Sequence, residues 1–315
     1  MAAHAEKLNW LVVGIGDITT RRVIPAIQAE PRSNLYGVVS RDRAKGARYS
    51  DRVWTDLDAA LGDQAVDVVY VATPVFLHAP QSIAALRAGK HVLCEKPVAM
   101  NYEEAARMVS VAEESGKTLG IAYYRRMYPK LQRARDLLAQ GAIGRPVLAE
   151  INCHDWFQTQ DGHRNWLVDP KQSGGGPLYD IASHRIDVLN FLFGKPVRVS
   201  GHLSDVVRGL KVEDSATVMI DYENGVRGIV DVRWHSHTPR DEFRIIGVDG
   251  EMILTPLSGP ALSYPGATEN LPAHSNLHYP CVENFVAAVL DGAHLYASGG
   301  SSIWTDWVTE RALGK

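Results

Sequence analysis

The sequence predicts an α/β protein in two parts, and three observations lead to this prediction. The chain has 315 residues, more than the roughly 250–300 at which a single hydrophobic core usually stops growing. Short β-branched segments alternate with helical patterns as far as residue 125, which is typical of a doubly wound parallel sheet. Beyond that point the candidate strands lengthen and alternate, as in an open, mostly antiparallel sheet. We expect an α/β domain over residues 1–125 and an α+β domain over 126–315.

The N-terminal elements follow a strand–helix order. Five short apolar segments suit strands buried on both faces: Leu11–Val13, Leu35–Val39, Val66–Val71, His91–Cys94 and Leu119–Ala122. Apolar residues at helical spacing predict helices between them, over Arg22–Ala29, Leu57–Leu61, Pro80–Ala88 and Tyr102–Glu114. Gly89 and Gly116 follow two of these helices, where a left-handed residue commonly ends a helix.

The C-terminal part begins with a predicted helix, Lys130–Gln140. Alternating strands are expected after it, over Val147–Asn152, Ala216–Tyr222, Val226–Arg233 and Glu242–Ile246. Glu223-Asn-Gly225 predicts a hairpin turn, and Val248-Asp-Gly250 predicts another. Such a sheet leaves one face open, and an open face favours pairing with a second subunit. We expect a homodimer or homotetramer formed through this sheet.

Composition excludes several classes of protein. With 33 Lys and Arg against 36 Asp and Glu, the net charge of −3 gives no basic field for nucleic acid or a membrane surface. No apolar run approaches the ~18 residues of a membrane span. The three cysteines are far apart in the sequence, which predicts neither a disulfide framework nor a structural zinc site. The N-terminal residues resemble no secretion signal, so we expect a cytoplasmic protein.

The first predicted strand leads into a glycine-containing turn, Gly14-Ile15-Gly16-Asp17-Ile18-Thr19. Glycines at these positions allow a tight turn and the close approach of a pyrophosphate, and the following helix offers N–H donors to that anion. An ordinary strand–helix turn is the alternative. The place of this turn after the first strand of an alternating β–α series favours a dinucleotide site.

The end of the second strand bears on which dinucleotide is bound. A carboxylate there would bind both ribose hydroxyls and select NAD. The chain instead has Ser40 and Arg41, followed by Asp42 and Lys45. Ser40, Arg41 and Lys45 would hold a 2′-phosphate, so NADP is favoured over NAD; alternatively, Asp42 serves the ribose. Thr73, Pro74 and His78 follow another strand and are expected to wall the cofactor, or else form only a turn.

Two further segments carry candidate reactive groups. Glu95 and Lys96 follow the strand His91–Cys94 and are expected to bind the cofactor, so Lys96 would enter the crevice beside the nicotinamide and exchange a proton there. Asp180 and His184 follow the glycine run Gly174–Gly176 and are four residues apart, hence on one helical face. A carboxylate and an imidazole placed together would grip and deprotonate an alcohol. Solvated surface residues and a helix cap are the alternatives.

Together these segments resemble the glucose–fructose oxidoreductase/inositol dehydrogenase family, often called Gfo/Idh/MocA. The stretches that carry the resemblance are Val13–Gly16, Val71–Pro74, Ala88–Pro97, Gly174–Asp187, Asn276–Pro280 and Val282–Phe285. The resemblance implies a Rossmann domain, a C-terminal open sheet, and hydride transfer between NAD(P) and a sugar, cyclitol or related compound. It implies that Lys96 relays a proton and that Asp180 and His184 bind and polarise the reacting hydroxyl; it implies no metal.

Some positions depart from the family pattern or remain open. Thr19 replaces a small residue, which predicts a wider phosphate turn, and Leu167 stands where many relatives carry Arg. Tyr124, Arg125 and Trp166 are expected to contact substrate, although Tyr124 and Arg125 could instead cap the domain junction. The aromatic segment from Cys153 to Trp166 either lines the substrate pocket or packs in the core. Two other functions are represented on this fold: a nucleotide-sensing regulator without catalysis, and a glycosidase that uses bound NAD.

Overall fold

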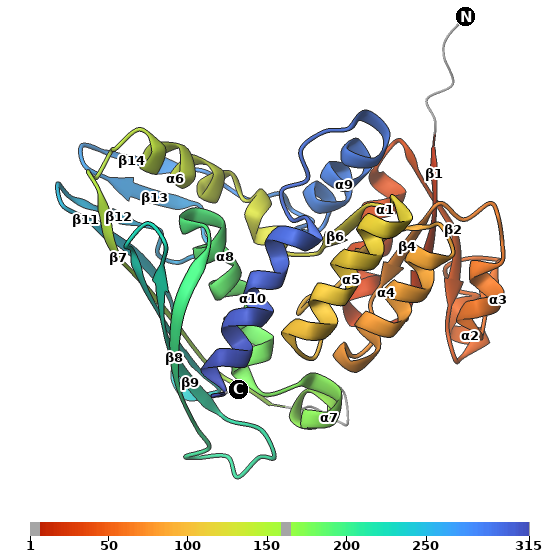
Figure 1. Ribbon diagram of the computed structural model, residues 1–315, viewed down its shortest axis with the longest axis horizontal. Helices are drawn as coiled ribbons and strands as arrows, with labels where there is room; N and C mark the ends of the chain where they lie inside the picture. The colour runs from red at the N-terminus through yellow and green to blue at the C-terminus, as the bar shows by residue number, and fades with distance from the viewer. Residues whose placement is uncertain (1–6, 159–164, 315) are drawn as a thin grey trace, which may run out of the picture. The chain divides into compact units, whose positions relative to one another are not determined.

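The computed structural model describes residues 7–158 and 165–314, which fall into two compact units (Figure 1). The first unit extends to Tyr124 and also contains His274–Ser302; the second contains Arg125–Ala273 and the residues from Ile303 onward. The sequence-based division placed all of residues 126–315 in the second domain. The segment His274–Ser302 belongs instead to the first unit, because Phe285 packs against Trp10 in its core and Asn276 donates to the carbonyl oxygen of Arg22 at 2.8 Å.

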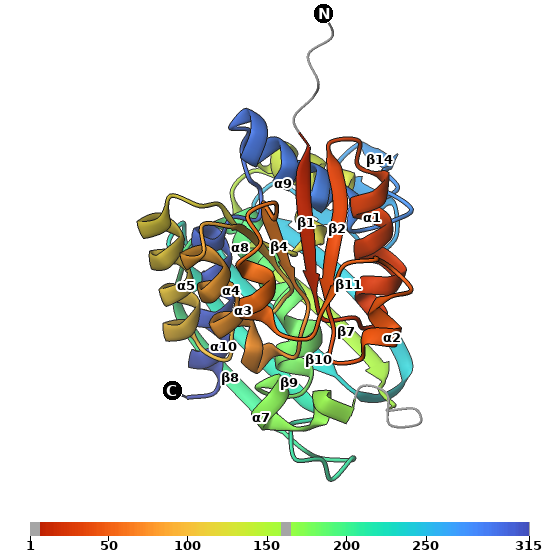
Figure 2. The same cartoon turned by 90° about the vertical axis from the view of Figure 1, so that its right-hand side faces the viewer.

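The first unit is built on a six-stranded parallel sheet in the order β3-β2-β1-β4-β5-β6. Its strands are β1 (Leu8–Val13), β2 (Ser33–Val39), β3 (Val53–Trp54), β4 (Val68–Val71), β5 (His91–Cys94) and β6 (Leu119–Ile121). Helices cover both faces: α1 packs with α9, and α4 packs with α5 (Figure 2). The helices are α1 (Ile24–Ala29), α2 (Arg43–Gly46), α3 (Leu57–Leu61), α4 (His78–Arg87), α5 (Tyr102–Ser115) and α9 (Tyr279–Asp291). The doubly wound parallel sheet is thus confirmed.

The predicted elements of this unit recur with small shifts at their ends. Every one of the five predicted strands is present, and Gly89 and Gly116 have the positive φ expected after a helix. The helix predicted over Arg22–Ala29 differs, because the chain first forms a π-helical turn, η1 (Thr19–Val23), and becomes α-helical only at Ile24. Two short helical turns, η2 (Val75–Leu77) and η3 (Tyr124–Met127), follow β4 and β6.

The second unit contains an eight-stranded sheet in the order β14-β13-β12-β11-β7-β10-β9-β8. All neighbouring strands are antiparallel except β7 and β10, which confirms the mostly antiparallel prediction. The strands are β7 (Pro146–Trp156), β8 (Pro196–Ser204), β9 (Ser215–Tyr222), β10 (Arg227–Arg233), β11 (His235–Gly247), β12 (Glu251–Ile253), β13 (Ala261–Tyr264) and β14 (Ala267–Asn270). Both predicted hairpin turns join antiparallel pairs, β9 with β10 and β11 with β12.

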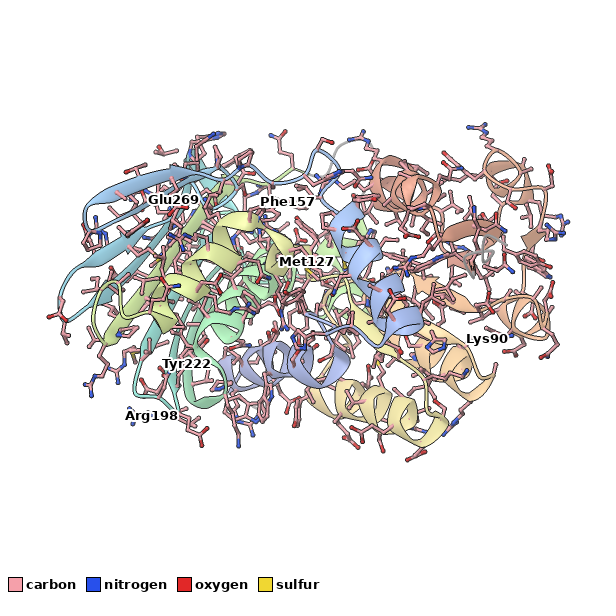
Figure 3. All side chains as sticks on the ribbon, turned by 90° about the horizontal axis from the view of Figure 1, so that it is seen from above. Lys90, Met127, Phe157, Arg198, Tyr222 and Glu269 are labelled. Carbon is pink, nitrogen blue, oxygen red and sulfur yellow. The ribbon has the colours of Figure 1, made fainter. Side chains whose placement is uncertain are left out.

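Helices lie along one face of this sheet (Figure 1). They are α6 (Pro129–Ala139), α7 (Pro170–Ser173), α8 (Ser183–Phe193) and α10 (Gly299–Ala312), with short turns η4 (Asn165–Val168) and η5 (Leu178–Ala182). The buried hydroxyl of Tyr222 on β9 donates to Asn190 on α8 at 2.9 Å, and its label in Figure 3 marks this layer between sheet and helix. The sheet therefore holds α8, and with it the segment that carries Asp180 and His184.

Candidate active site

The glycine-containing turn after β1 leaves room for a ligand beside Gly16. Gly14 has a φ of +93°, and a Cβ there would lie 2.6 Å from the carbonyl oxygen of Ala72 on the neighbouring strand end. A Cβ on Gly16 would meet no atom within 4 Å. One glycine thus lets two strand ends approach, while the other keeps open space at the start of a helix, which fits a bound pyrophosphate.

Thr19 closes this turn from within. Its side chain is fully buried, and its hydroxyl accepts the N–H of Gly16 at 2.7 Å and donates to the Gly16 carbonyl at 2.9 Å. Asp17 is exposed and pairs with Arg21 at 2.8 Å, and Ile18 is half-buried. The sheet order places this turn next to β4, at the point where the strand order reverses, which is where doubly wound sheets bind ligands.

The end of β2 presents cations to solvent. Arg41 and Lys45 are exposed, whereas Ser40 is buried and donates to the carbonyl of Asp42 at 2.8 Å. The Asp42 carboxylate accepts the N–H of Lys45 at 3.0 Å and so forms the N-cap of α2. Asp42 therefore has a structural role that the sequence did not reveal. To bind the ribose, the same carboxylate would have to release the N–H of Lys45 or accept from both groups.

The loop after β4 is held by two side-chain contacts. Thr73 donates to Gln81 at 2.7 Å, and Pro74 precedes the turn η2. The ring nitrogens of His78 lie 2.8 Å from the carbonyl oxygens of Thr73 and Pro97. His78 is buried, which lowers its pKa although both carbonyls favour the protonated ring. His78 thus ties the loop after β4 to the segment that carries Lys96; a direct contact with cofactor stays a prediction.

Lys96 stands at the carboxyl end of β5, half-buried, directly after a buried carboxylate. Glu95 accepts hydrogen bonds from Tyr70 at 2.8 Å and from the Lys96 backbone at 3.2 Å, and His278 lies 3.1 Å away. Burial raises the pKa of Glu95, but the hydrogen bonds from His278 and Tyr70 and the charge of Lys96 outweigh it and lower that pKa. Lys96 therefore follows a carboxylate that is held as an anion.

In the second unit, Asp180 and His184 follow a glycine run that is packed against protein atoms. Tyr179 lies against the sites where Gly174 and Gly175 would carry a Cβ, and the backbone of Glu213 blocks that site on Gly176. The buried Glu213 carboxylate accepts the N–H of Leu178 at 3.0 Å, where η5 begins. Burial raises the pKa of Glu213, and this effect outweighs the backbone N–H groups, which favour the anion and lower the pKa.

Asp180 is half-buried on the π-helical turn η5, and His184 is buried in the first turn of α8. The chain thus changes from π-helix to α-helix between the two candidate residues, and π-helical turns are frequent at functional sites. A buried ion pair holds α8 in place, because Arg126, which precedes α6, donates to Asp187 on α8 at 2.6–3.1 Å. Burial raises the pKa of Asp187 in spite of this guanidinium. Tyr124 in the first unit and Arg125 in the second are also buried.

A pocket of about 380 Å³ opens on the second unit beside Arg185, the residue after His184. Its lining residues are Cys153, His154, Asp155, Arg185, Pro239, Arg240 and Asp241. Arg185 is 5% exposed and donates from one terminal nitrogen to Asp241 at 3.0 Å. Its Nε has no hydrogen-bond partner within the described parts of the chain. A buried donor without a partner is costly, so this nitrogen is suited to a ligand oxygen.

The aromatic segment before the site is largely packed against protein. Phe157, labelled in Figure 3, stacks on Trp234 with ring centroids 4.0 Å apart, and Leu167 and Trp166 belong to the same cluster. The ring of Trp156 stacks on His237 at 3.8 Å and lies 4.8 Å from the Arg208 guanidinium. Core packing thus accounts for these rings, and residues 159–164 of the segment lie outside the described residues.

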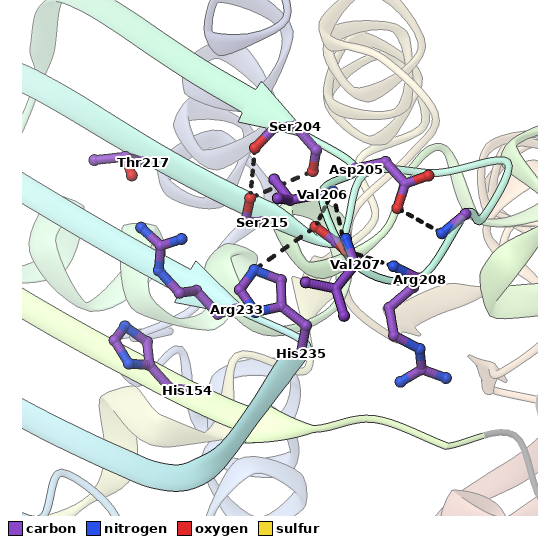
Figure 4. Close-up of polar contacts among 12 residues, drawn as sticks. His154, Ser204, Asp205, Val206, Val207, Arg208, Ser215, Thr217, Arg233 and His235 are labelled. Atoms are coloured by element: carbon purple, nitrogen blue, oxygen red, sulfur yellow. Dashed lines mark hydrogen bonds and ion pairs between the residues drawn. The ribbon is translucent and has the colours of Figure 1, made fainter.

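His154 and His235 in the second unit each lie beside a carboxylate. Asp214 accepts the N–H groups of Val206, Val207 and Arg208 at 2.9–3.2 Å, and the ring of His235, labelled in Figure 4, lies 3.7 Å from this carboxylate. His154 lies 2.7 Å from Asp231. Within residues 7–158 and 165–314, no group of three His, Cys, Asp or Glu side chains is arranged to hold a metal ion. In the same ranges, no helix is long and apolar enough to cross a membrane.

Comparison with known proteins agrees with this architecture. Residues 8–123 match the oxidoreductase family with an NAD-binding Rossmann fold, and residues 131–253 match the GFO/IDH/MocA C-terminal domain. A 1,5-anhydro-D-fructose reductase of Ensifer adhaerens is 29% identical over 313 residues, covering 94% of this chain and 92% of that protein. A dTDP-3,4-didehydro-2,6-dideoxy-α-D-glucose 3-reductase of Streptomyces violaceoruber is 32% identical, covering 87% and 84%.

A solved structure is similar over the same length. GenD2 from gentamicin A biosynthesis, in complex with NAD, is 25% identical with a TM-score of 0.84, covering 98% of this chain and 95% of that one. The chain is therefore an oxidoreductase with an NAD-binding Rossmann fold. It belongs to the GFO/IDH/MocA family, and the fold and family predicted from the sequence are confirmed.

Proposed function

We propose that the chain transfers a hydride between NADP and a sugar, cyclitol or related hydroxy or oxo compound. One observation carries this proposal: Lys96 stands at the carboxyl end of β5, on the strand-end edge where the Gly14–Gly16 turn leaves space for a dinucleotide. The named substrates of both relatives are sugar derivatives, which supports this substrate class.

The proposed mechanism assigns one task to each reactive residue. When bound, the nicotinamide supplies the hydride acceptor for oxidation or the hydride donor for reduction. Asp180 and His184 bind and polarise the reacting hydroxyl. As the carbinol C–H bond breaks and the carbonyl forms, the hydroxyl proton passes to Lys96 or His184; reduction runs these transfers backward. Glu95, held as an anion, accepts the backbone N–H of Lys96 and so helps to place this residue.

The preference for NADP is proposed from the end of β2. Arg41 and Lys45 are exposed there, and the Asp42 carboxylate is engaged as a helix cap, so the available charge is positive. A 2′-phosphate would gain from these cations, whereas ribose hydroxyls would lack a free carboxylate. Arg41→Asp should lower kcat/KM for NADP at least tenfold relative to NAD. An unchanged ratio, with Arg87→Asp as the exposed control, would refute the assignment.

The pocket beside Arg185 is proposed to receive the substrate. Its lining combines the guanidinium group of Arg185 with the carboxylates of Asp155 and Asp241, a mixture of donors and acceptors that suits a molecule with several hydroxyl groups. Tyr124, Arg125 and Trp166 remain proposed substrate contacts. Arg185→Met should raise KM for the sugar while leaving the Kd of the cofactor unchanged.

We also infer an assembly and a location. The face of the second unit's sheet opposite its helices carries polar side chains, among them Asp231, Arg233 and Thr217, and would pair with a second copy to form a homodimer or homotetramer. The proposed partners are the substrate, the cofactor and a second copy of the chain; we propose no nucleic-acid or membrane partner. The three cysteines are buried free thiols, which supports a cytoplasmic location.

The central experiment combines a substrate matrix with one substitution. NAD and NADP are each tested against sugars, cyclitols and their keto forms by nicotinamide absorbance. Lys96→Ala should reduce turnover at least a thousandfold while cofactor binding stays measurable, and Lys211→Ala, which alters an exposed lysine, should change neither. Full activity of Lys96→Ala would refute the mechanism. Tight cofactor binding without turnover on any substrate would favour a regulator instead.

A further inference from the structure

A buried network lies directly behind the segment that carries Lys96. Both oxygens of the Glu95 carboxylate are occupied: Oε1 accepts from Tyr70 and meets His278, and Oε2 accepts the backbone N–H of Lys96. Tyr70 comes from the adjacent strand β4 and is fully buried. The charge of Glu95 is thus surrounded by protein donors from three parts of the chain. Neither the fold nor the proposed chemistry by itself requires such a network.

His278 reaches this network from the segment that returns to the first unit. It is 1% exposed, immediately precedes α9, and stacks against Tyr124 with ring centroids 4.9 Å apart. Because a carboxylate only accepts, the nitrogen facing Glu95 at 3.1 Å carries the hydrogen. Its Nδ1 has no hydrogen-bond partner among residues 7–158 and 165–314. The ring is therefore held by its hydrogen bond to Glu95 and by its contact with the ring of Tyr124.

The charged and titratable groups that face Glu95 leave it as the one negative charge at this place. His278 meets one oxygen of the carboxylate and the Lys96 backbone N–H donates to the other, while the charge of Glu95 favours the protonated ring of His78 on α4. The remaining titratable neighbours are Tyr70 and two buried thiols, Cys94 and Cys281. Burial raises the pKa of Tyr70 well above its usual value, so its hydroxyl stays a neutral donor. The carboxylate that accepts the Lys96 backbone N–H is thus also held by two side-chain donors from other segments of the chain.

We propose that Tyr70, Glu95 and His278 are positioning residues for Lys96, because they fix the backbone from which the Lys96 side chain extends. This inference rests on the proposed role of Lys96 in proton transfer. Glu95 accepts the backbone N–H of Lys96 at 3.2 Å, and His278 and Tyr70 hold the other oxygen of that carboxylate in a buried place. The returning segment is then part of the catalytic apparatus through His278.

The test is the turnover of carbonyl reduction, measured separately from cofactor binding. The amide in Glu95→Gln keeps only one acceptor oxygen, so one of the two sides of the Glu95 contact is lost and kcat should fall about tenfold. His278→Phe should also lower kcat about tenfold, with the cofactor Kd within twofold of wild type. His278→Gln keeps an N–H donor and should recover most of the loss.

Two comparisons make the outcome decisive. If both residues act through the backbone of Lys96, the double variant Glu95→Gln/His278→Phe should lower kcat by less than the product of the two single effects. His294→Phe, an exposed histidine of the same segment, should change nothing. Tyr70→Phe removes a single oxygen and gives a second, milder probe if a larger substitution impairs folding. Unchanged kcat in Glu95→Gln, Tyr70→Phe and His278→Phe, with Lys96→Ala inactive, would overturn this inference alone; an active Lys96→Ala would overturn the proposed function.

Discussion

The two glycine-containing turns of this chain look alike in sequence but are built for opposite purposes. Each precedes a π-helical turn, η1 after Gly14 and Gly16 and η5 after Gly174–Gly176. In the first turn, a Cβ on Gly16 would enter open space. In the second, Tyr179 and Glu213 already lie where each Cβ would be. One turn reserves space for a ligand, and the other uses the absence of side chains to pack against the protein.

This difference separates two uses of glycine that a motif alone does not distinguish. In the first unit the protein withholds side chains so that an anion can approach the start of a helix. In the second unit a tyrosine ring and the backbone of Glu213 hold the start of η5, and thereby fix Asp180. Substitutions in the two turns should therefore affect different properties, ligand affinity in one and folding stability in the other.

The largest effect is expected for Gly176→Ala. The new methyl group would meet the backbone of Glu213, which cannot move as a flexible side chain would. Overpacking of this kind costs about 1–3 kcal/mol and more against backbone, so we expect the free energy of unfolding to fall by about 3 kcal/mol. Denaturant titration measures it, and Gly300→Ala, where the methyl meets no atom within 4 Å, is the control. Equal stability of both variants would contradict the packed-turn interpretation.

Gly16→Ala should show the opposite pattern. Because the methyl group meets no protein atom, the free energy of unfolding should stay within about 0.5 kcal/mol of wild type. The methyl would occupy the space assigned to pyrophosphate, so we expect the cofactor Kd to rise about 10–100-fold, or ~1.4–2.7 kcal/mol. Titration of protein fluorescence with NADPH measures this. Unchanged affinity in a stable variant would remove the phosphate site from this turn.

Thr19→Val tests the brace of the first turn and should have a smaller effect. The substitution keeps the shape but deletes the hydroxyl that accepts from Gly16 and donates back to it. An N–H left without its partner costs about 1–2 kcal/mol, seen as lower stability in the cofactor-free protein. Thr19→Ser retains the hydroxyl and should stay near wild type. Equal melting of Val and Ser variants would show that the brace is dispensable.

The architecture of both units could be predicted from the sequence because buried strands and hairpin turns leave local patterns. The strands from Leu8 to Ile121 and the turn Glu223–Gly225 are such cases. The return of His274–Ser302 to the first unit could not be predicted, since Phe285 and His278 find their partners nearly 200 residues or more away. Likewise, the family motifs include Lys96 and His278 but do not reveal that His278 and Tyr70 meet at Glu95, because these contacts exist only in the folded chain.

Glu213 offers the smallest and most specific test. Its carboxylate lies at the start of η5, and a ligand anion would take the corresponding place at the first turn. Burial raises the pKa of Glu213, so the folded state binds this proton more tightly than the unfolded state does. The stability that Glu213 contributes is then fully present below its ordinary pKa of about 4.3 and is lost as pH rises through the raised value.

In Glu213→Gln the side chain cannot ionise. The free energy of unfolding of wild type minus that of this variant should therefore decrease as the pH is increased from 4 to 7. Denaturant titration at each pH measures both values. A difference that grows with pH would mean that the N–H groups of Gly176 and Leu178 hold Glu213 as an anion.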